Sequence, residues 1–213
     1  MSKFTSPHLG KITQSSGGVT FTNWKGINVM KAKATSVANP KSQGQQENRT
    51  KFSNIVRYAR QILNGLNITL KSFAIKKSQY NVFVGGNVDK IDSTTGLYQV
   101  SFNDTIVLSR GTLEGLISPS TGFMSPTQMQ ITWNPTGYNV NTSSKDLVAT
   151  YFYNANKDEF AFAQTNSERA SGNGLANRPA NWTAGDTVSV WICAYNSQNN
   201  ASNNQYIGDV VLT

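Results

Sequence analysis

The stretch GDTVSVWICAYN, residues 185–196, includes eight consecutive residues, Val188 to Tyr195, of which only Ser189 is polar. β-branched and aromatic side chains at this density favour a β-strand. Successive side chains of a strand point to opposite faces, so a run that is apolar at nearly every position is apolar on both faces. We therefore expect this strand to lie in the centre of a sheet or beneath a contact with another subunit.

The rest of the C-terminal half has the same strand character. Turn-forming clusters such as NANKDE and SQNNASNN separate its strand segments, which are TQMQITWNP (127–135), KDLVATYFYNA (145–155), EFAFAQTN (159–166) and YIGDVVLT (206–213). Short strands at this spacing, without intervening helical periodicity, predict an antiparallel β-sandwich over residues 111–213. An immunoglobulin-like sandwich is the expectation and a jelly roll the alternative, because strand order cannot be read from sequence. Trp133 and Trp191 are expected to fill the space between the sheets.

One amphipathic helix is predicted in NPKSQGQQENRTKFSNIVRYARQILNGL, residues 39–66. Ser42 and Gln45 have the spacing of a capping box, and Gly65 is suited to end the helix. Apolar residues recur at the helical period and form a stripe that we expect to face a core. The stripe comprises Phe52, Ile55, Val56, Ala59, Ile62, Leu63 and Leu66.

Strands are also predicted on both sides of this helix. Residues 19–24 and 27–34 alternate around Lys25-Gly26, which indicates a hairpin. After the helix, period-two patterns predict short strands in NITLKSFAIKK (67–77), QYNVFVG (79–85), LYQVSF (97–102) and TIVLS (105–109). The expected fold is therefore mainly β with one amphipathic helix. It divides into a flexible N-terminal arm (1–16), a basic hairpin-helix-strand region (17–110) and the sandwich domain (111–213). The SGNGLANRP segment is interpreted as a loop.

The sequence offers little material for catalysis. His8 is the sole histidine and Cys193 the sole cysteine, whereas a protein zinc site needs several such ligands. We expect Cys193 to be a buried structural thiol. Asp158 and Glu159 are adjacent, a poor arrangement for an acid and a base that flank one substrate bond. No phosphate-binding glycine loop, dinucleotide fingerprint or serine-nucleophile motif is present. We therefore expect no catalytic residue, metal, cofactor or small-molecule substrate.

Basic residues are concentrated near the N-terminus. Residues 1–77 contain thirteen Lys or Arg and one acidic residue, whereas residues 78–213 contain six basic and ten acidic residues. Such asymmetry indicates a surface that contacts a polyanion, a solvated basic face, or a contact with an acidic neighbouring subunit. Contact with phosphates would be independent of sequence and sensitive to salt. The candidate phosphate-facing patch consists of Lys25, Lys31, Lys33, Lys41, Arg49, Lys51, Arg57 and Arg60.

Targeting signals are not evident. The sequence contains no apolar run of about 18 residues and no apolar signal-peptide region near its start. We therefore expect no membrane span and no classical secretion, with synthesis in a cytoplasm.

Several motifs together resemble those of an uncharacterised family of Bacteroidetes and phage-associated proteins, a domain of unknown function. The motifs are GGVTFTNWKGINVMKAKATSVANPKSQGQQENRTKF (17–52), LSRGTLEG (108–115), MQITWNP (129–135), DTVSVWICAYN (186–196) and YIGDVVL (206–212). The most specific part is the helix start with Asn39, Pro40, Lys41, Ser42, Gln45, Arg49 and Phe52. The resemblance covers roughly residues 17–213. It implies a C-terminal immunoglobulin-like or fibronectin-like domain and no catalytic residues.

These observations lead to three functional expectations. The first is a non-enzymatic structural protein of a bacteriophage virion, such as a capsid, vertex, decoration or appendage subunit. It would act as a homo-oligomer, contact other virion proteins, and meet packaged nucleic acid non-specifically through its basic half. The second is a sequence-independent nucleic-acid-binding or host-takeover module. The third is a carbohydrate-binding adhesin that uses loop aromatics such as Tyr138 and Trp182.

Overall fold

The computed structural model describes residues 2–4, 13–34, 36, 41–90, 105–125, 127–136 and 140–213. The chain divides into two compact units, residues 1–45 and 46–213. Strand is the dominant secondary structure at 39% of the chain, against 23% helix, which confirms the predicted mainly-β class. The predicted strand at 97–102 and His8 lie outside the described residues.

The first unit contains a four-stranded antiparallel sheet. Its strands are β1 (Ser2–Phe4), β2 (Gln14–Ser16), β3 (Val19–Trp24) and β4 (Ile27–Ala32), in the order β1-β4-β3-β2. The predicted hairpin is confirmed as β3 and β4. Lys25 and Gly26 have φ values of 52° and 83°, the left-handed pair that a two-residue hairpin turn requires. Strands β1 and β2 lie within residues 1–16, the segment predicted as a flexible arm. They pair with the two edges of this hairpin.

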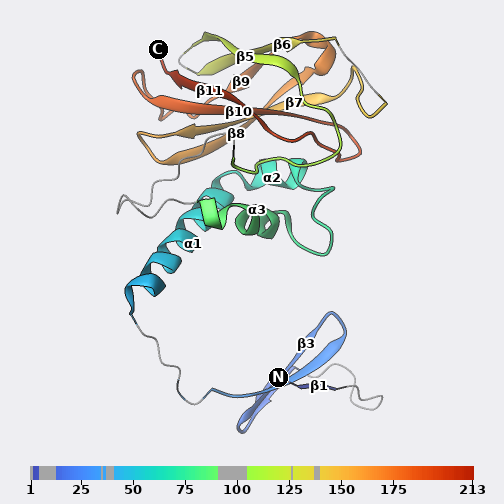
Figure 1. The fold of residues 1–213 in the computed structure, drawn as a ribbon, viewed down its shortest axis with the longest axis vertical. Coiled ribbons are helices and arrows are strands. Elements are labelled where there is room, and N and C mark those ends of the chain that lie inside the picture. Colours follow the sequence, from blue (N-terminus) through green and yellow to red (C-terminus); the bar gives the residue numbers. More distant parts are fainter. Residues whose placement is uncertain are drawn as a thin grey trace. The chain divides into compact units, whose positions relative to one another are not determined.

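The second unit contains a sandwich of seven strands in two antiparallel sheets (Figure 1). One sheet has the order β11-β10-β7-β8 and the other the order β5-β6-β9. The strands are β5 (Ile117–Met124), β6 (Gln128–Asn134), β7 (Leu147–Asn154), β8 (Glu159–Glu168), β9 (Asn173–Asn177), β10 (Thr187–Tyr195) and β11 (Gln205–Val211). Strand β10 lies between two others, as predicted. The sequence did not indicate β5, and its interpretation of the β9 segment as a loop was wrong.

The four-stranded sheet is covered on both faces, which makes this unit three-layered. Val188, Val190 and Ile192 of β10 pack toward the three-stranded sheet. Trp191 and Cys193 of the same strand pack toward the helices. The expectation for Trp133 is confirmed, since it lies between the sheets at 5% exposure. The expectation for Trp191 is wrong, because it fills the space between the sheet and the helices.

Three helices form the third layer: α1 (Gln43–Gln61), α2 (Leu63–Thr69) and α3 (Gln79–Asn87). Two single turns of 3-10 helix, η1 (Val88–Lys90) and η2 (Arg169–Ser171), complete the described helical structure. The strands predicted at 67–77 and 79–85 are wrong: the first segment is the end of α2 and turns, and the second is α3. Ser78 caps α3 by accepting a hydrogen bond from the Asn81 backbone N–H. A short apolar run of this kind is equally compatible with a strand and with a buried helix, so the spacing of its apolar residues could not distinguish the two.

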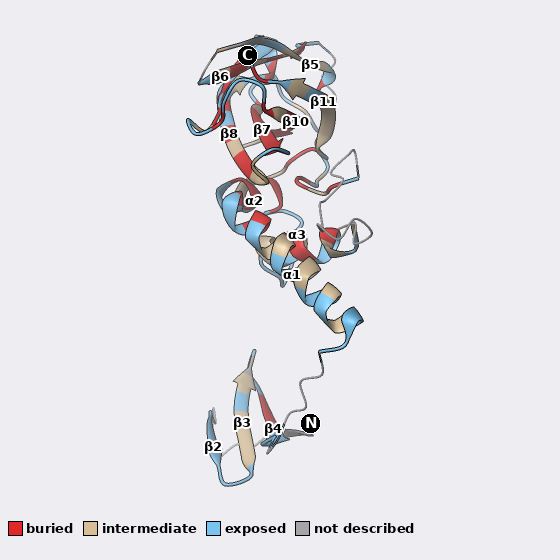
Figure 2. Ribbon diagram, turned by 90° about the vertical axis from the view of Figure 1, so that its left-hand side faces the viewer, coloured by how far each residue is buried: buried red, intermediate tan, exposed pale blue. Residues whose placement is uncertain are grey.

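The apolar stripe of α1 is buried only in part. Ile55 and Ala59 are fully buried, whereas Phe52 is 55% exposed. Within residues 46–54 no side chain is buried, because this part of α1 extends beyond the sheet that covers the rest (Figure 2). Ile62 departs from helical geometry, with φ −108° and ψ 18°, and separates α1 from α2. Leu63, the first residue after this break, is 36% exposed. The prediction of one continuous buried stripe is therefore wrong at Phe52 and Leu63.

Gly65 lies within α2 rather than at a helix end, and it allows α2 to approach the sheet closely. A Cβ atom at this position would lie 2.4 Å from Cδ2 of Phe162 and 2.8 Å from the hydroxyl of Tyr151. The same hydroxyl hydrogen-bonds with Thr69 at the end of α2, at 2.7 Å. The absence of a side chain at Gly65 therefore lets α2 pack closely on the sheet, and the hydrogen bond between Thr69 and Tyr151 holds it there.

The strand predicted at 105–109 is wrong: this segment joins no sheet, and asparagine side chains supply hydrogen bonds that neighbouring strands would otherwise provide. Asn87 donates to the Val107 carbonyl and accepts from the Val107 N–H, at 2.9 and 2.8 Å. Asn204 accepts from the Leu108 N–H at 3.0 Å and donates to the Ile106 carbonyl at 3.0 Å. These amides satisfy the backbone of a segment that connects the helices to the sandwich.

Candidate interaction surfaces

The predicted basic patch is divided between the two units. Lys25, Lys31, Lys33 and Lys41 belong to the first unit, and Arg49, Lys51, Arg57 and Arg60 belong to α1 in the second. All except Lys51 are exposed. At about 100° per residue, Arg49, Arg57 and Arg60 share one face of α1, and Lys51 lies on the opposite side. The structure therefore brings together three of the four basic residues on the helix.

Arg57 forms an ion pair within the protein. Its guanidinium contacts the carboxylate of Asp158, in the turn between β7 and β8. Asp158 has a left-handed backbone with φ 53° and also accepts hydrogen bonds from the hydroxyls of Tyr58 and Tyr153. Tyr58 is 1% exposed and packs edge-on against Phe160. This cluster attaches α1 to the sandwich, so the main contact of Arg57 is structural.

Electrostatic effects in this cluster favour the ionised carboxylate. Partial burial alone would raise the pKa of Asp158, but hydrogen bonds from Arg57, Tyr58 and Tyr153 outweigh it and lower the pKa below the usual 3.8. Burial, with the nearby carboxylate, raises the pKa of both tyrosine hydroxyls far above the ordinary value of 10.0. Both tyrosines thus remain protonated donors. With these three donors, the carboxylate of Asp158 connects α1 to β7.

The other singled-out residues also have structural surroundings. Glu159 accepts hydrogen bonds from Asn181 and from the indole N–H of Trp182, at 2.9 and 3.0 Å. Trp182 is 3% exposed and lies in the core between the sheets, so it does not serve as the carbohydrate-binding loop aromatic that we expected. Tyr138 lies outside the described residues. Burial raises the pKa of the Cys193 thiol to about 12, and this residue is fully buried as predicted.

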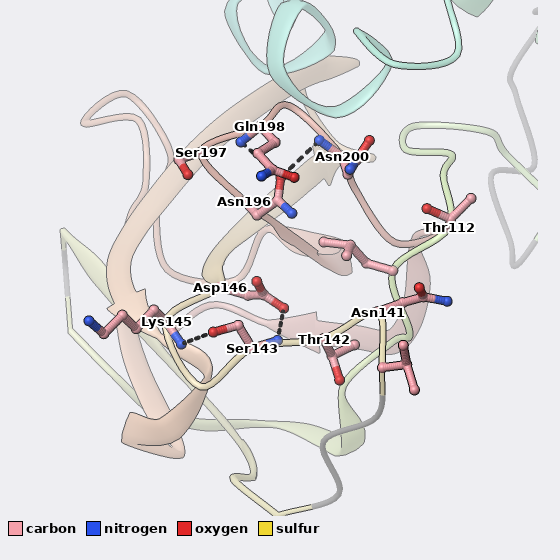
Figure 3. A pocket seen from close by; sticks show the side chains of 12 residues that line it. Thr112, Asn141, Thr142, Ser143, Lys145, Asp146, Asn196, Ser197, Gln198 and Asn200 are labelled. Atoms are coloured by element: carbon pink, nitrogen blue, oxygen red, sulfur yellow. Dashed lines mark hydrogen bonds between the residues drawn. The ribbon is translucent and has the colours of Figure 1, made fainter.

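A pocket of about 480 Å³ opens among three segments at one end of the sandwich (Figure 3). The segments are residues 112–113 before β5, residues 140–146 between β6 and β7, and residues 196–200 between β10 and β11. Side-chain amides and hydroxyls supply most of the lining, and Leu113 and Val140 supply its apolar part. We refer to this feature as the loop pocket.

Buried charge holds two walls of the loop pocket together. Arg169 is 4% exposed, and its Nε atom lies 3.4 Å from a carboxylate oxygen of Asp146, which is 2% exposed. Arg169 also donates to the carbonyls of Glu114 and Gly115, at 2.8 and 2.9 Å. One guanidinium thus connects the segment before β5 with the loop before β7. A buried ion pair with further hydrogen bonds fixes local geometry strongly, because loss of either partner leaves an uncompensated charge.

The third wall is organised by an asparagine. The side-chain carbonyl of Asn196 accepts from the backbone N–H groups of Gln198 and Asn200, both at 3.0 Å. The backbone N–H of Asn196 donates to the Asn200 carbonyl, and Asn199 takes a left-handed φ of 63°. The loop therefore closes on itself and presents the side chains of Gln198 and Asn200 to the pocket.

The described residues contain no group of three or more His, Cys, Asp or Glu side chains that could hold a metal ion. Across the same residues, no helix combines the length and apolar character needed to cross a membrane.

Comparison with protein families places the chain. Residues 10–208 match a family of unknown function, DUF6266. The chain belongs to this family. No curated protein matches the sequence significantly. A similar solved structure is the twitchin kinase region from C. elegans, with 13% identity, a TM-score of 0.35, and coverage of 46% of this chain and 16% of that chain. A likeness at this level supports no conclusion about this DUF6266 protein.

Sequence reasoning missed the loop pocket of this DUF6266 protein. The cluster SQNNASNN was recognised as a turn, and its density of amides was the available signal. The sequence does not indicate that residues 112–113 and 140–146 lie beside this turn at one end of the sandwich. That proximity depends on strand order and on Arg169, which no local pattern distinguishes from a surface arginine.

Proposed function

We propose that this protein is a non-enzymatic structural protein of a bacteriophage virion, a capsid, vertex, decoration or appendage subunit that acts through contacts with its own copies and other virion proteins. It would be made in the bacterial host cytoplasm before incorporation. The virion part rests on the sequence resemblance. The assembly part rests on the first unit, whose exposed apolar sheet face is the observation that carries the proposal.

Few of the described side chains in the sheet of the first unit are buried. Asn28 and Val29 are buried, whereas Ile27 and Met30, which lie on opposite faces of β4, are each 39% exposed. Met30 lies directly opposite Phe21 in the ladder, and cross-strand neighbours share a face. An apolar sheet face is normally buried against another element. We infer that another molecule supplies it.

Charge favours a second copy of the chain as that molecule, in a head-to-tail arrangement. Residues 1–45 contain six lysines and no acidic residue, so two such sheets would repel each other face to face. Residues 111–213 contain seven acidic and four basic residues. The basic sheet of one copy therefore complements the sandwich of the next. Head-to-tail contacts generate closed rings or open helical filaments.

Strand order supports an immunoglobulin-like assignment of the sandwich. In immunoglobulin folds, strands A, B and E share one sheet and strands C, F and G share the other. The order β5-β6-β9 corresponds to A, B and E, and β7, β10 and β11 correspond to C, F and G, with β8 added beside C. A jelly roll would have eight strands. We infer the immunoglobulin-like arrangement, which serves widely as a contact module.

Size-exclusion chromatography with light scattering, at low and high salt, tests the assembly proposal. We expect wild-type protein to form a discrete oligomer free of nucleic acid, as judged by the ratio of absorbance at 260 and 280 nm. Met30→Asp places a charge on the apolar face and should give monomers. Thr22→Asp is the matched control, because Thr22 is exposed on the opposite face of the same strand pair. A wild-type chain that is monomeric at every salt concentration would overturn the proposal.

A nucleic-acid-binding or host-takeover module is the alternative, and the six lysines of the first unit favour it. Binding to phosphates alone would be independent of sequence, and its affinity would fall steeply with salt. A wild-type monomer that elutes with nucleic acid at low salt and without it at high salt would select this function. Reversal of Lys25, Lys31, Lys33 and Lys41 to glutamate should then abolish the co-elution.

A further inference from the structure

We propose that the loop pocket is a binding site for a neutral saccharide, one or two sugar units in size. Its volume of about 480 Å³ lies within the range of about 300–1,000 Å³ that is typical of small-molecule sites. This inference is independent of the assembly proposal, because the pocket belongs to the sandwich alone.

The chemistry of the lining selects the ligand class. Asn and Gln amides carry both donors and acceptors, and Ser and Thr hydroxyls can act as either. Asn200 faces Thr112 across the space between the loops (Figure 3), and Gln198 also lines the pocket. A ligand that satisfies such groups must itself alternate donors and acceptors over a small volume. Sugar hydroxyls, each a donor and an acceptor, meet this requirement.

Electrostatics argues against a charged ligand. The lining contains one basic and one acidic residue, Lys145 and Asp146. The carboxylate of Asp146 is paired with Arg169 behind the wall and accepts a hydrogen bond from the Ser143 backbone N–H. The side chain of Lys145 extends away from the space between the loops (Figure 3). The pocket therefore presents polar groups without a concentrated charge, unlike a phosphate or carboxylate site.

The pocket is also organised before any ligand binds. Arg169 fixes two walls through Asp146 and through the carbonyls of Glu114 and Gly115. Asn196 fixes the third wall through two backbone N–H groups. A ligand would then bind without first ordering the loops, which reduces the entropic cost of association. Two of these loops connect the strands that correspond to B–C and F–G, and these are two of the three loops that carry recognition in immunoglobulin variable domains.

A peptide ligand is less consistent with this geometry. Extended peptides commonly bind by adding a strand to an open sheet edge, where backbone hydrogen bonds supply the affinity. The loop pocket lies among loops and is lined mainly by side chains. A compact ring with several hydroxyls fits such a hollow better than a linear backbone does.

Saturation-transfer NMR on the full chain tests the proposal, followed by titration calorimetry for any hit. The panel contains glucose, galactose, mannose, N-acetylglucosamine and their common disaccharides, together with the tetrapeptide Gly-Asn-Ser-Thr. We expect at least one saccharide to bind. The double variant Gln198→Ala/Asn200→Ala should weaken its Kd at least about fivefold, because it removes hydrogen-bonding groups that contact the ligand. Asn64→Ala, an exposed amide on α2, is the control and should leave the Kd unchanged.

Thermal unfolding shows whether the double variant keeps its fold. If its melting temperature falls, Thr112→Val replaces it, since this change removes one hydroxyl from an exposed position with little change in volume. The proposal is overturned if no saccharide binds at millimolar concentration, or if the peptide alone binds. It is also overturned if a saccharide binds with the same Kd in the wild type and in the folded pocket variant.

Discussion

Gly65→Ala tests whether α2 is held against the sheet by close approach. The added Cβ would lie 2.4 Å from Cδ2 and 2.6 Å from Cγ of Phe162, whereas carbon atoms in contact prefer about 3.5–4.0 Å. The helix or the ring must therefore move by about 1 Å. Overpacking of this kind costs about 1–3 kcal/mol. Alanine is intrinsically better in a helix by up to about 1 kcal/mol, so the net effect should be destabilising.

The matched control is Gly85→Ala. Gly85 lies in the interior of α3 with no atom within 4 Å of an added Cβ, so only helix propensity applies and the variant should be stabilised. Urea and thermal unfolding, followed by circular dichroism, measure both variants, and 1 kcal/mol corresponds to about 2–4 °C in a domain of this size. The two substitutions should shift the melting temperature in opposite directions. Equal stabilisation by both would refute the close packing of α2.

The remaining predictions concern α1, the carboxylate cluster and the buried thiol. Ile55→Ala should cost about 2–5 kcal/mol, and Phe52→Ala within about 1 kcal/mol, because Ile55 is fully buried and Phe52 is 55% exposed; equal costs in urea unfolding would contradict this assignment. Because the pKa of Asp158 is lowered in the folded protein, its carboxylate contributes stability above about pH 4 that is lost as pH falls through the folded pKa. The free energy of unfolding of Asp158→Asn should therefore depend less on acid pH than that of the wild type. An unchanged dependence on pH would argue against the cluster. Cys193, with its pKa raised to about 12, should resist alkylation at neutral pH until urea unfolds the chain, and rapid labelling of native protein would place it elsewhere.

Strand positions in the sandwich could be predicted because each carries its own pattern. β6, β7, β8, β10 and β11 all occur where alternating or continuous apolar runs predicted them. β9 was missed because four of its five residues are small or polar. A Cβ on Gly174 would lie 2.7 Å from Cβ of Thr165 in β8, so the approach of the two strands selects a glycine that strand propensity disfavours.

The helical layer was predictable only where it is amphipathic and long. The Ile55 and Ala59 part of α1 follows the period, but the exposure of Phe52 depends on where the covering sheet ends. α3 contains a short apolar run, and its helical form depends on the Ser78 cap and on burial of Phe83. Such tertiary contacts override local patterns in short segments.

The candidate sites show the same division. The charge asymmetry was visible in the sequence, yet the partner of Arg57 was not, because Asp158 is 101 residues away. The loop pocket depends on three segments that only the strand order brings together.

The three-layered architecture of the second unit limits which of its surfaces can bind a ligand. Both faces of the four-stranded sheet are already covered, one by helices and one by the second sheet. In the second unit, ligands can then reach the outer surfaces, the strand edges and the loop ends. The loop end is the place where Arg169 and Asn196 hold polar side chains around a hollow. In the first unit, Met30 is 39% exposed on one face of the described part of the sheet. The proposed saccharide site and the proposed assembly surface therefore lie on different units of the chain.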